Sequence, residues 1–438
     1  MKYKPYPAYK DSGVEWLGEV PESWDILPCR AFVVERTAKN DDGGNEYYLS
    51  LMAKIGIIPY DEKGDVGNKK PEDLTKCKLV SKGDFVINSM NYGIGSYGVS
   101  PYNGVCSPVY IVMSPRHDKV DSGYAFRIFE NPAFQSYAQS FGNGILEHRA
   151  AINWDILKVI GVGIPPIDEQ FIITTFLDRE TSKIDTLIAK QEKLIELLQE
   201  KRQALISHAV TKGLNPDAPM KDSGVEWLGE VPEHWDVKRL KHLSPMITVG
   251  IVVEPSKHYV DEGIPALRSL NIMPGEINLE SVVFISPEAN QQLSKSKLRN
   301  GDLVTVRSGQ PGTTAVVPAE MDGFNCIDLI IIRASTKITS KALCWFMNSD
   351  GAQHQFNEGA GGAIQQHFNI GMAINLLIPC PPAEEQDNLC AFLDLETAKI
   401  DTLIEKSRRS IELMREHRTA LISAAVTGKI DVREAVAC

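Results

Sequence analysis

One internal duplication limits what this chain can fold into more than any other feature of its sequence. Residues 10–25 read KDSGVEWLGEVPESWD and residues 221–236 read KDSGVEWLGEVPEHWD, so the two segments match at 15 of 16 positions. A second repeated block, KIDTLI, occurs at 183–188 and again 216 residues later at 399–404. Because both blocks recur in the same order, the chain is a tandem repeat of one structural unit.

The segments between the repeated blocks have diverged but keep a common scaffold. KGDFV at 82–86 is similar to NGDLV at 300–304, and short β-rich runs such as 84–88 and 303–306 are bounded by Gly, Pro, Asn and Ser clusters. This pattern indicates mixed α/β domains. We therefore predict an α+β fold with this order of segments: an opening motif (1–25), a first mixed domain (26–163), a central helix (164–212), a linker with the second opening motif (213–236), a second mixed domain (237–377), and a C-terminal helix with a tail (378–438).

Each copy ends in a long helical stretch. Asp168 to Val210 contains neither Gly nor Pro and follows a Pro-Pro pair, which is typical of a helix start. Heptad a positions counted from Ile184 and Ile400 are mostly apolar. Such a stripe must be buried, and the nearest equivalent surface is the other copy, so we predict an antiparallel coiled coil about a pseudo-twofold axis. The alternative is that each helix packs on its own domain. The predicted core of the helix pair is Ile184, Leu187, Leu194, Leu198, Leu205, Ile400, Leu403, Ile411, Met414 and Leu421.

The net charge of −11 argues at first against a nucleic-acid partner. However, residues 26–163 and residues 237–377 each carry equal numbers of basic and acidic side chains, so all the excess acidity lies outside these two segments. A neutral domain can bind a phosphate backbone if its basic groups share one face. The eight cysteines form no C-x-x-C pair, and no signal peptide or spanning segment is evident, so we expect a cytoplasmic protein with reduced cysteines.

The sequence offers no catalytic site. Asn131-Pro132-Ala133-Phe134 is one residue from the N-P-P-[F/Y] motif of adenine-N6 methyltransferases, but no glycine-rich cofactor loop precedes it. An asparagine cap with proline at the first helical position explains it better. The chain has no nucleotide-binding G-x-x-x-x-G-K-[ST] motif and no paired histidine spacing, so we expect neither a metal nor a cofactor of its own.

At the repeated motifs the chain resembles the specificity subunit of type I restriction–modification systems. The resemblance rests on the doubled KDSGVEWLGEVPE-x-W, the P-P…E-Q helix start, KIDTLI, and ALISAAVTGKIDVR at 420–433 with its first-copy partner near 204–213. It implies a non-catalytic protein with two target-recognition domains, each reading one half of a split DNA site, and a helix pair that sets their spacing. It also implies two modification subunits that use S-adenosylmethionine and restriction subunits that use ATP and Mg.

Base readout requires hydrogen-bonding side chains near the grooves, so polar loop residues at equivalent places in the two copies are our candidate DNA contacts. In the first domain they are Asn88, Ser89, Asn91, Tyr92, Glu147, His148 and Arg149. In the second domain they are Arg307, Ser308, Gln310, Gln365, Gln366 and His367. Three rival interpretations remain open: a stand-alone nuclease or methyltransferase, a purely structural coiled-coil scaffold, and an orphan specificity subunit.

Overall fold

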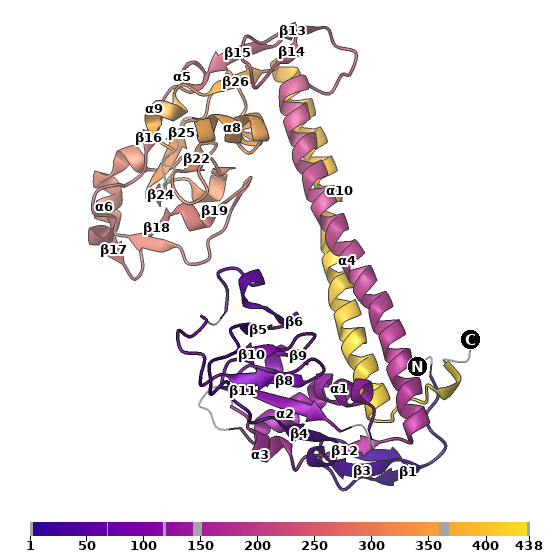
Figure 1. The fold of residues 1–438 in the computed structure, drawn as a ribbon. Helices are drawn as coiled ribbons and strands as arrows, with labels where there is room; N and C mark the ends of the chain where they lie inside the picture. Colours follow the sequence, from indigo (N-terminus) through magenta and orange to yellow (C-terminus); the bar gives the residue numbers. More distant parts are fainter. Residues whose placement is uncertain (1–2, 68, 117–119, 143–150, 359–367, 436–438) are drawn as a thin grey trace. The chain divides into compact units, whose positions relative to one another are not determined.

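The computed structural model describes residues 3–67, 69–116, 120–142, 151–358 and 368–435. The chain forms two compact units (Figure 1). Unit 1 consists of residues 1–191 and 409–438, and unit 2 consists of residues 192–408. Each unit therefore combines one mixed α/β domain with parts of both long helices.

A four-stranded antiparallel sheet forms the centre of the first domain. Its order is β4–β11–β8–β9, with β4 at Val33–Glu35, β11 at Tyr110–Pro115, β8 at Phe85–Asn88 and β9 at Tyr97–Val99. Side chains alternate between the two faces of a strand. On β8, Phe85 and Ile87 therefore join the core that includes α1 (Ser122–Glu130) and α2 (Pro132–Ser140).

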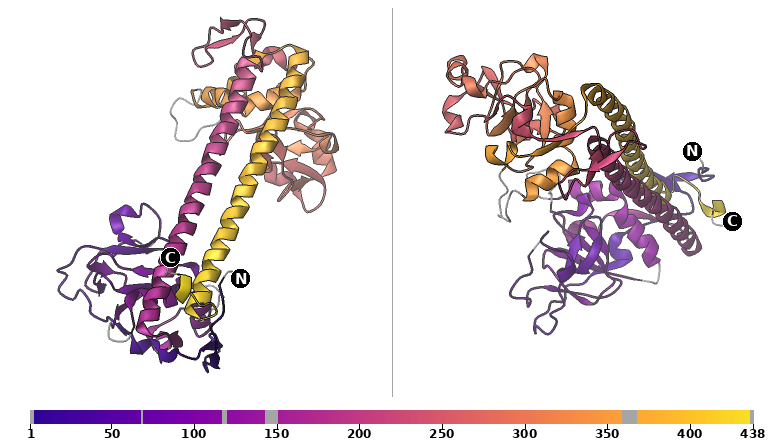
Figure 2. Two further views of the ribbon diagram at one scale, coloured as in Figure 1. Left: turned by 90° about the vertical axis from the view of Figure 1, so that its right-hand side faces the viewer. Right: turned by 90° about the horizontal axis from the view of Figure 1, so that it is seen from above.

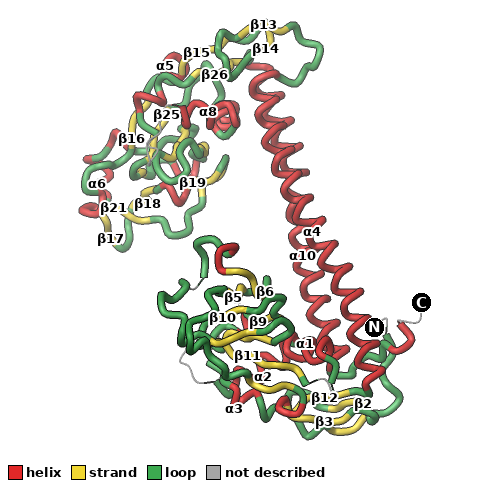
Figure 3. The backbone as a smooth tube through the Cα atoms, in the orientation of Figure 1, coloured by secondary structure: helices red, strands yellow, loops and turns green. Residues whose placement is uncertain are grey.

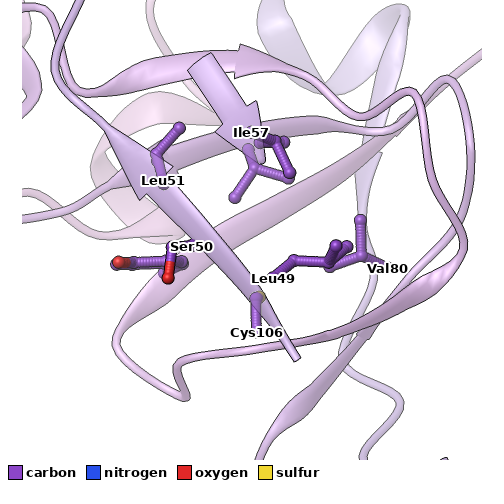
Figure 4. Close-up of a pocket in the computed structure, with 8 residues that line it drawn as sticks. Leu49, Ser50, Leu51, Ile57, Val80 and Cys106 are labelled. Carbon is purple, nitrogen blue, oxygen red and sulfur yellow. The ribbon is translucent and has the colours of Figure 1, made fainter. Parts of the chain in front are cut away.

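The other face of this sheet is covered by a hairpin, β5 (Leu49–Met52) and β6 (Gly56–Pro59). Val86 and Val112 of the sheet form a small apolar core with Leu49, Leu51 and Ile57 of the hairpin. Figure 4 shows these hairpin side chains around Val80 and Cys106, and the packing leaves no room for a water molecule. The hairpin is therefore held firmly against the sheet.

The second domain repeats the central sheet. Its order is β16–β25–β22–β23, with β16 at Ile247–Val249, β25 at Leu329–Ile332, β22 at Leu303–Val306 and β23 at Thr314–Val316. One face packs on α7 (Ser340–Met347) and α8 (Asp350–Glu358) in one apolar cluster. The domains differ in what covers the opposite face. The second domain has a further four-stranded sheet in the order β17–β21–β18–β24 (Tyr259–Val260, Val283–Ile285, Ile264–Leu267 and Asn325–Cys326).

The opening motifs form equivalent hairpins. In unit 1, β1 (Tyr9–Asp11) pairs with β2 (Glu19–Pro21), and in unit 2, β13 (Met220–Asp222) pairs with β14 (Glu230–Pro232). The strands that follow, β3 (Asp25–Pro28) and β15 (Asp236–Arg239), pair with β12 (Gly161–Ile164) and β26 (Leu377–Cys380). The start and the end of each domain are thus tied together beside the long helix.

A repeated Glu-Gln pair fastens each long helix to its domain. Glu169 Oε1 accepts a hydrogen bond from Nε1 of the buried Trp24 at 2.8 Å, and Gln170 Oε1 accepts one from the backbone N–H of Asp121, the N-cap of α1, at 2.8 Å. In unit 2, Trp235 Nε1 donates to Glu385 Oε2 at 2.7 Å, and Gln386 Oε1 accepts from the N-cap of α7, Thr339, at 2.7 Å. These hydrogen bonds between helix and domain are therefore duplicated together with the sequence. We call the two opening motifs and the two long helices, with these contacts, the frame.

The two long helices are α4 (Ile167–Lys212) and α10 (Ala383–Val426), and α4 contains the whole predicted helical stretch. Both views of Figure 2 show them side by side. In unit 1, Arg418 Nε donates to Asp185 Oδ1 at 3.0 Å, and in unit 2, Arg202 Nε donates to Asp401 Oδ1 at 2.9 Å. Residue numbers rise on one helix as they fall on the other, so the helices run antiparallel. This confirms the predicted antiparallel pair of a two-domain α+β fold.

The predicted helix-pair core is partly wrong. Three residues predicted at a positions, Ile184, Ile400 and Leu421, are buried, as predicted. The predicted core residue Ile411 is also buried. Leu198, Leu205 and Met414 are half-buried. However, Leu187, Leu194 and Leu403 are 51%, 42% and 49% exposed.

The correct second column lies one residue further along each helix. Ile404 is only 6% exposed, and its repeat mate Ile188 is half-buried. A seam can advance from an a position by three or by four residues, and both choices offered an apolar side chain here. None of the helices among the described residues is long and apolar enough to cross a membrane.

Candidate nucleic-acid interface

In the first domain, four predicted contacts lie in or beside the turn that joins β8 to β9. β9 is labelled in Figure 3, where strands are yellow and loops and turns are green. The turn is shaped by Asn88, whose Oδ1 accepts from the backbone N–H of Met90 at 3.1 Å and whose carbonyl accepts from the N–H of Asn91 at 3.1 Å. Asn88 itself is 5% exposed, whereas Ser89 and Asn91 are half-buried. Asn88 therefore holds the turn, and Ser89 and Asn91 are more accessible than Asn88.

Tyr92 supports the turn from beneath. The ring is fully buried, and its hydroxyl donates to the carbonyl of Phe129 at 2.6 Å. Burial raises the pKa of this hydroxyl well above its ordinary value, so it remains a neutral donor. A side chain enclosed in this way is not available to a base, and we leave Tyr92 out of the proposed surface.

Sequence reasoning missed the tip of the β5–β6 hairpin. The backbone N–H of Lys54 donates to the carbonyl of Gly95 in the β8–β9 turn at 2.9 Å, which joins the two turns. Around this contact Ile55, Met90 and Ile94 are 68%, 48% and 51% exposed. In DNA-binding proteins, exposed apolar groups of this kind contact thymine methyl groups or wedge between base steps. The signal was a lysine flanked by apolar residues in a hairpin turn, but only the fold shows that this turn lies beside the other.

In the second domain, three predicted contacts lie in the turn between β22 and β23. Gln310 is exposed, and its carbonyl accepts from the hydroxyl of Thr313 at 3.0 Å. The turn rests on the rings of Phe356 and Phe368, whose centroids are 4.6 Å apart, and Gly312 lies so close to Phe356 that a Cβ there would collide with it. Arg307 makes an ion pair with Asp328, and its Nε donates to the carbonyl of Phe368 at 3.2 Å.

In each domain, a residue of the first predicted stretch is hydrogen-bonded to a described residue that comes shortly after the second predicted stretch in the sequence. The backbone N–H of Ile152 donates to the carbonyl of Ser89 at 3.1 Å, and that of Phe368 donates to the carbonyl of Arg307 at 2.9 Å. Ile152 and Phe368 closely follow the second predicted stretch of their domains and are themselves 216 residues apart. The predicted contacts Glu147, His148, Arg149, Gln365, Gln366 and His367 lie outside the described residues.

A cavity of about 440 Å³ lies at the opposite end of the first sheet, beside the start of β8. It contains Arg36 and Asp84, which form an ion pair at 2.7 Å, and the hydroxyl of Ser114 donates to the same carboxylate at 2.8 Å. The hydrogen bond with Asp84 raises the pKa of Arg36. Because these charges satisfy one another, the pair serves the fold. Within the described part of the chain, no group of three or more His, Cys, Asp or Glu side chains is arranged to hold a metal ion.

These features define a class of protein in which a duplicated helical frame carries two domains with the same sheet and different turns. Residues 38–197 match the family model for the type I restriction modification DNA specificity domain. The specificity subunit of the type I restriction enzyme MjaVIII from Methanocaldococcus jannaschii is 23% identical over 94% of each chain. The specificity subunit of EcoKI from Escherichia coli K12 is 24% identical over 66% of this chain and 62% of that protein.

Solved structures show the same fold. A chain from a structure described as the basis of complex assembly and conformational transition in the type I R-M system superposes with a TM-score of 0.71 at 14% identity, covering 94% of this chain and 99% of that one. The HsdS subunit from Thermoanaerobacter tengcongensis superposes with a TM-score of 0.52 at 14% identity, covering 94% and 98%. Over most of its length the chain is thus similar to type I restriction enzyme specificity subunits, and it shares their fold.

Proposed function

We propose that this chain is the non-catalytic DNA-reading subunit of a type I restriction–modification complex. Each domain reads one half of a bipartite DNA site through its β8–β9 or β22–β23 turn and the adjoining loops, and the helix pair sets the spacing between the halves. The observation that carries the proposal is the contrast between frame and turns. The Glu-Gln fastening recurs in both units, whereas the turns share the same sheet position and differ in side chains.

The same proposal assigns the partners. Two modification subunits, which supply S-adenosylmethionine chemistry, and restriction subunits, which use ATP and Mg, assemble on this frame. Exposed leucines on the helix pair support two equivalent docking surfaces. Leu187 and Leu413 are 51% and 48% exposed in unit 1, and their repeat mates Leu403 and Leu197 are both 49% exposed in unit 2. Equivalent surfaces fit two copies of one partner, because identical contacts recur at both.

Genome-wide mapping of methylated adenine, with and without this gene, tests the proposal. We expect one bipartite motif, with two short specific halves separated by unspecified bases, to lose its methylation when the gene is deleted. Complementation with the intact gene should restore it. An unchanged methylation map in a cell that carries the partner genes would contradict the proposal.

A second experiment separates the proposal from a stand-alone enzyme. The purified chain is incubated with DNA, S-adenosylmethionine and Mg, and methyl transfer and strand cleavage are measured. We expect DNA binding that weakens with salt, as phosphate contacts require, and no turnover. Turnover by the chain alone would favour the enzyme, and association with the modification subunits without any DNA binding would favour a purely structural scaffold.

A further inference from the structure

The central sheets of the two domains have equivalent last residue pairs between their two middle strands. The residues just beyond these pairs, at the corner of each sheet, can therefore be compared between the domains. In the first domain the last pair of the β8–β11 ladder is Asn88 with Tyr110. In the second domain the last pair of β22–β25 is Val306 with Leu329. The residues one step beyond these pairs occupy the same corner of the sheet, next to the turn.

The corners carry different chemistry. In the first domain they are Ser89 and Val109, and Val109 is 49% exposed. In the second domain they are Arg307 and Asp328, which form an ion pair whose side chains are 22% and 43% exposed. A hydroxyl and an apolar group have thus been replaced by a guanidinium and a carboxylate at one place on a common scaffold.

The backbone of Asp328 is held in an unusual conformation. Its φ is +53°, in the left-handed region that residues other than glycine rarely adopt, although Asp and Asn enter it more readily than most. The N–H of Asp328 donates to the carbonyl of Ile251 at 3.1 Å, and the N–H of Ile251 donates to the carbonyl of Cys326 at 2.8 Å. Irregular pairing of this kind re-aims a side chain, and here the carboxylate meets Arg307.

The Arg307 guanidinium uses only some of its N–H donors within the protein. A guanidinium carries five N–H donors. Nε donates to the carbonyl of Phe368, and Nη1 donates to Asp328. Within the part of the chain that the structure describes, Nη2 has no partner. Three donors therefore remain, one on Nη1 and two on Nη2, and O6 and N7 of guanine accept two donors from an arginine.

A structural ion pair in the same domain provides the contrast. Asp302 and Arg333 are 2% and 8% exposed, and the first domain has the corresponding buried aspartate, Asp84, paired with Arg36. A buried aspartate paired with an arginine thus occurs in both domains, and we assign this ion pair a structural role. The Arg307–Asp328 pair is partly exposed at the turn, where such a pair adds little stability, and its place in the first domain holds no ion pair.

We propose, given that the chain is a DNA-reading specificity subunit, that Arg307 reads a guanine in the half-site of the second domain and that Asp328 positions it. The guanidinium donates to O6 and N7 of that guanine, while the carboxylate and the Phe368 carbonyl hold its orientation. The first domain, with Ser89 and Val109 at this corner, lacks the bidentate donor. The two half-sites therefore differ in a G·C pair at the corresponding position.

Variants of the full chain, assembled with its modification subunits, test this by methylated-adenine mapping and by binding to duplexes in which each specific base pair is replaced in turn. Arg307→Ala should lose roughly 5- to 150-fold of the preference at one G·C position of one half-site. Arg307→Lys should lose part of this preference, because the ammonium group lacks the planar fork of the guanidinium. Asp328→Gly keeps access to the left-handed backbone without the carboxylate and should lose several-fold at the same position. Asp328→Asn keeps an acceptor and should lose less. Lys238→Ala, which removes an exposed ion pair with Asp236 elsewhere in the domain, is the matched control and should change no base preference.

The outcomes are distinct. If the wild-type complex shows a bipartite motif and the Arg307 variants keep every base preference, the inference is overturned and the proposed function stands. If the wild-type complex shows no bipartite motif, the proposed function itself fails. A loss at an A·T pair overturns the guanine assignment. A loss in Asp328→Gly with Arg307→Ala unchanged overturns the division of roles, because the carboxylate would then read a cytosine amino group directly. Thermal unfolding and subunit co-elution confirm that each variant is folded and assembled.

Discussion

Glu169 shows how one side chain can secure an entire unit. Its carboxylate is buried and accepts from the Tyr6 hydroxyl at 2.7 Å and from the Trp24 indole at 2.8 Å. Burial and the hydrogen bond to Glu169 raise the pKa of Tyr6 far above its ordinary value, so both partners remain neutral donors. The helix, the opening motif and the N-terminal segment thus meet at one acceptor.

Replacing Glu169 should therefore cost more than replacing its repeat mate. Glu169→Ala leaves two buried donors unpaired, and we expect a loss of about 2–4 kcal/mol in the free energy of unfolding. Glu385→Ala should cost about 1 kcal/mol, because the Glu385 side chain is 43% exposed and water can replace it. Urea unfolding of both variants measures the difference. Glu169→Gln, which keeps an acceptor oxygen, is the control, and equal losses in the two alanine variants would contradict the argument.

Single residues also mark the limit of what the sequence can predict. Contact of Arg307, Ser308 and Gln310 with DNA remains a prediction, but their position in a turn was predicted, because polar residues at a repeat-equivalent turn are visible in the sequence. The burial of Tyr92 was not, because turn residues look alike until packing decides which of them faces the core. Asp328 was missed for a related reason, since its backbone is hydrogen-bonded to Ile251, which is distant in the sequence.

At the scale of elements, the helix pair illustrates what periodicity does and does not determine. A stretch without Gly or Pro predicted the first long helix, and apolar heptad positions counted from Ile184 and from Ile400 predicted an apolar stripe on each helix. Leu403 and Ile404 are adjacent and both apolar, so the sequence alone could not choose between them. Packing selects Ile404, and the leucine remains exposed.

This adjacent pair gives a matched test. Ile404→Ala removes a buried side chain from the seam and should lower the free energy of unfolding by about 2–4 kcal/mol. Leu403→Ala should change it by no more than about 0.5 kcal/mol, as at other exposed sites. If Leu403 contributes to docking, the same variant should weaken co-elution with the modification subunits. A large stability loss in Leu403→Ala would show that the seam has been assigned to the wrong column.

At the scale of the whole molecule, the duplication explains which contacts were kept. Arg202 with Asp401 and Arg418 with Asp185 are copies of one interaction at an offset of 216 residues. The buried aspartates Asp84 and Asp302 are likewise retained in both domains, although their arginine partners follow different strands, Arg36 after β4 and Arg333 after β25. A frame that is held by duplicated contacts can remain unchanged while the turns on it diverge, as separate reading of two half-sites requires.

If the helix pair sets the half-site spacing, lengthening both helices together should change the DNA that is recognised. Repeating residues 185–191 in α4 and residues 401–407 in α10 adds one heptad at equivalent points, which keeps the seam on the same face. Seven residues extend a helix by about 10 Å, which corresponds to about 3 base pairs of DNA. We expect methylation to move to a motif with the same two halves and a spacer longer by about 3 base pairs. Lengthening only one helix shifts the repeat-related Arg–Asp pairs out of register and should abolish assembly. An unchanged spacer in the doubly lengthened chain would show that spacing is set elsewhere, because the two reading domains would then keep their separation independently of the helices.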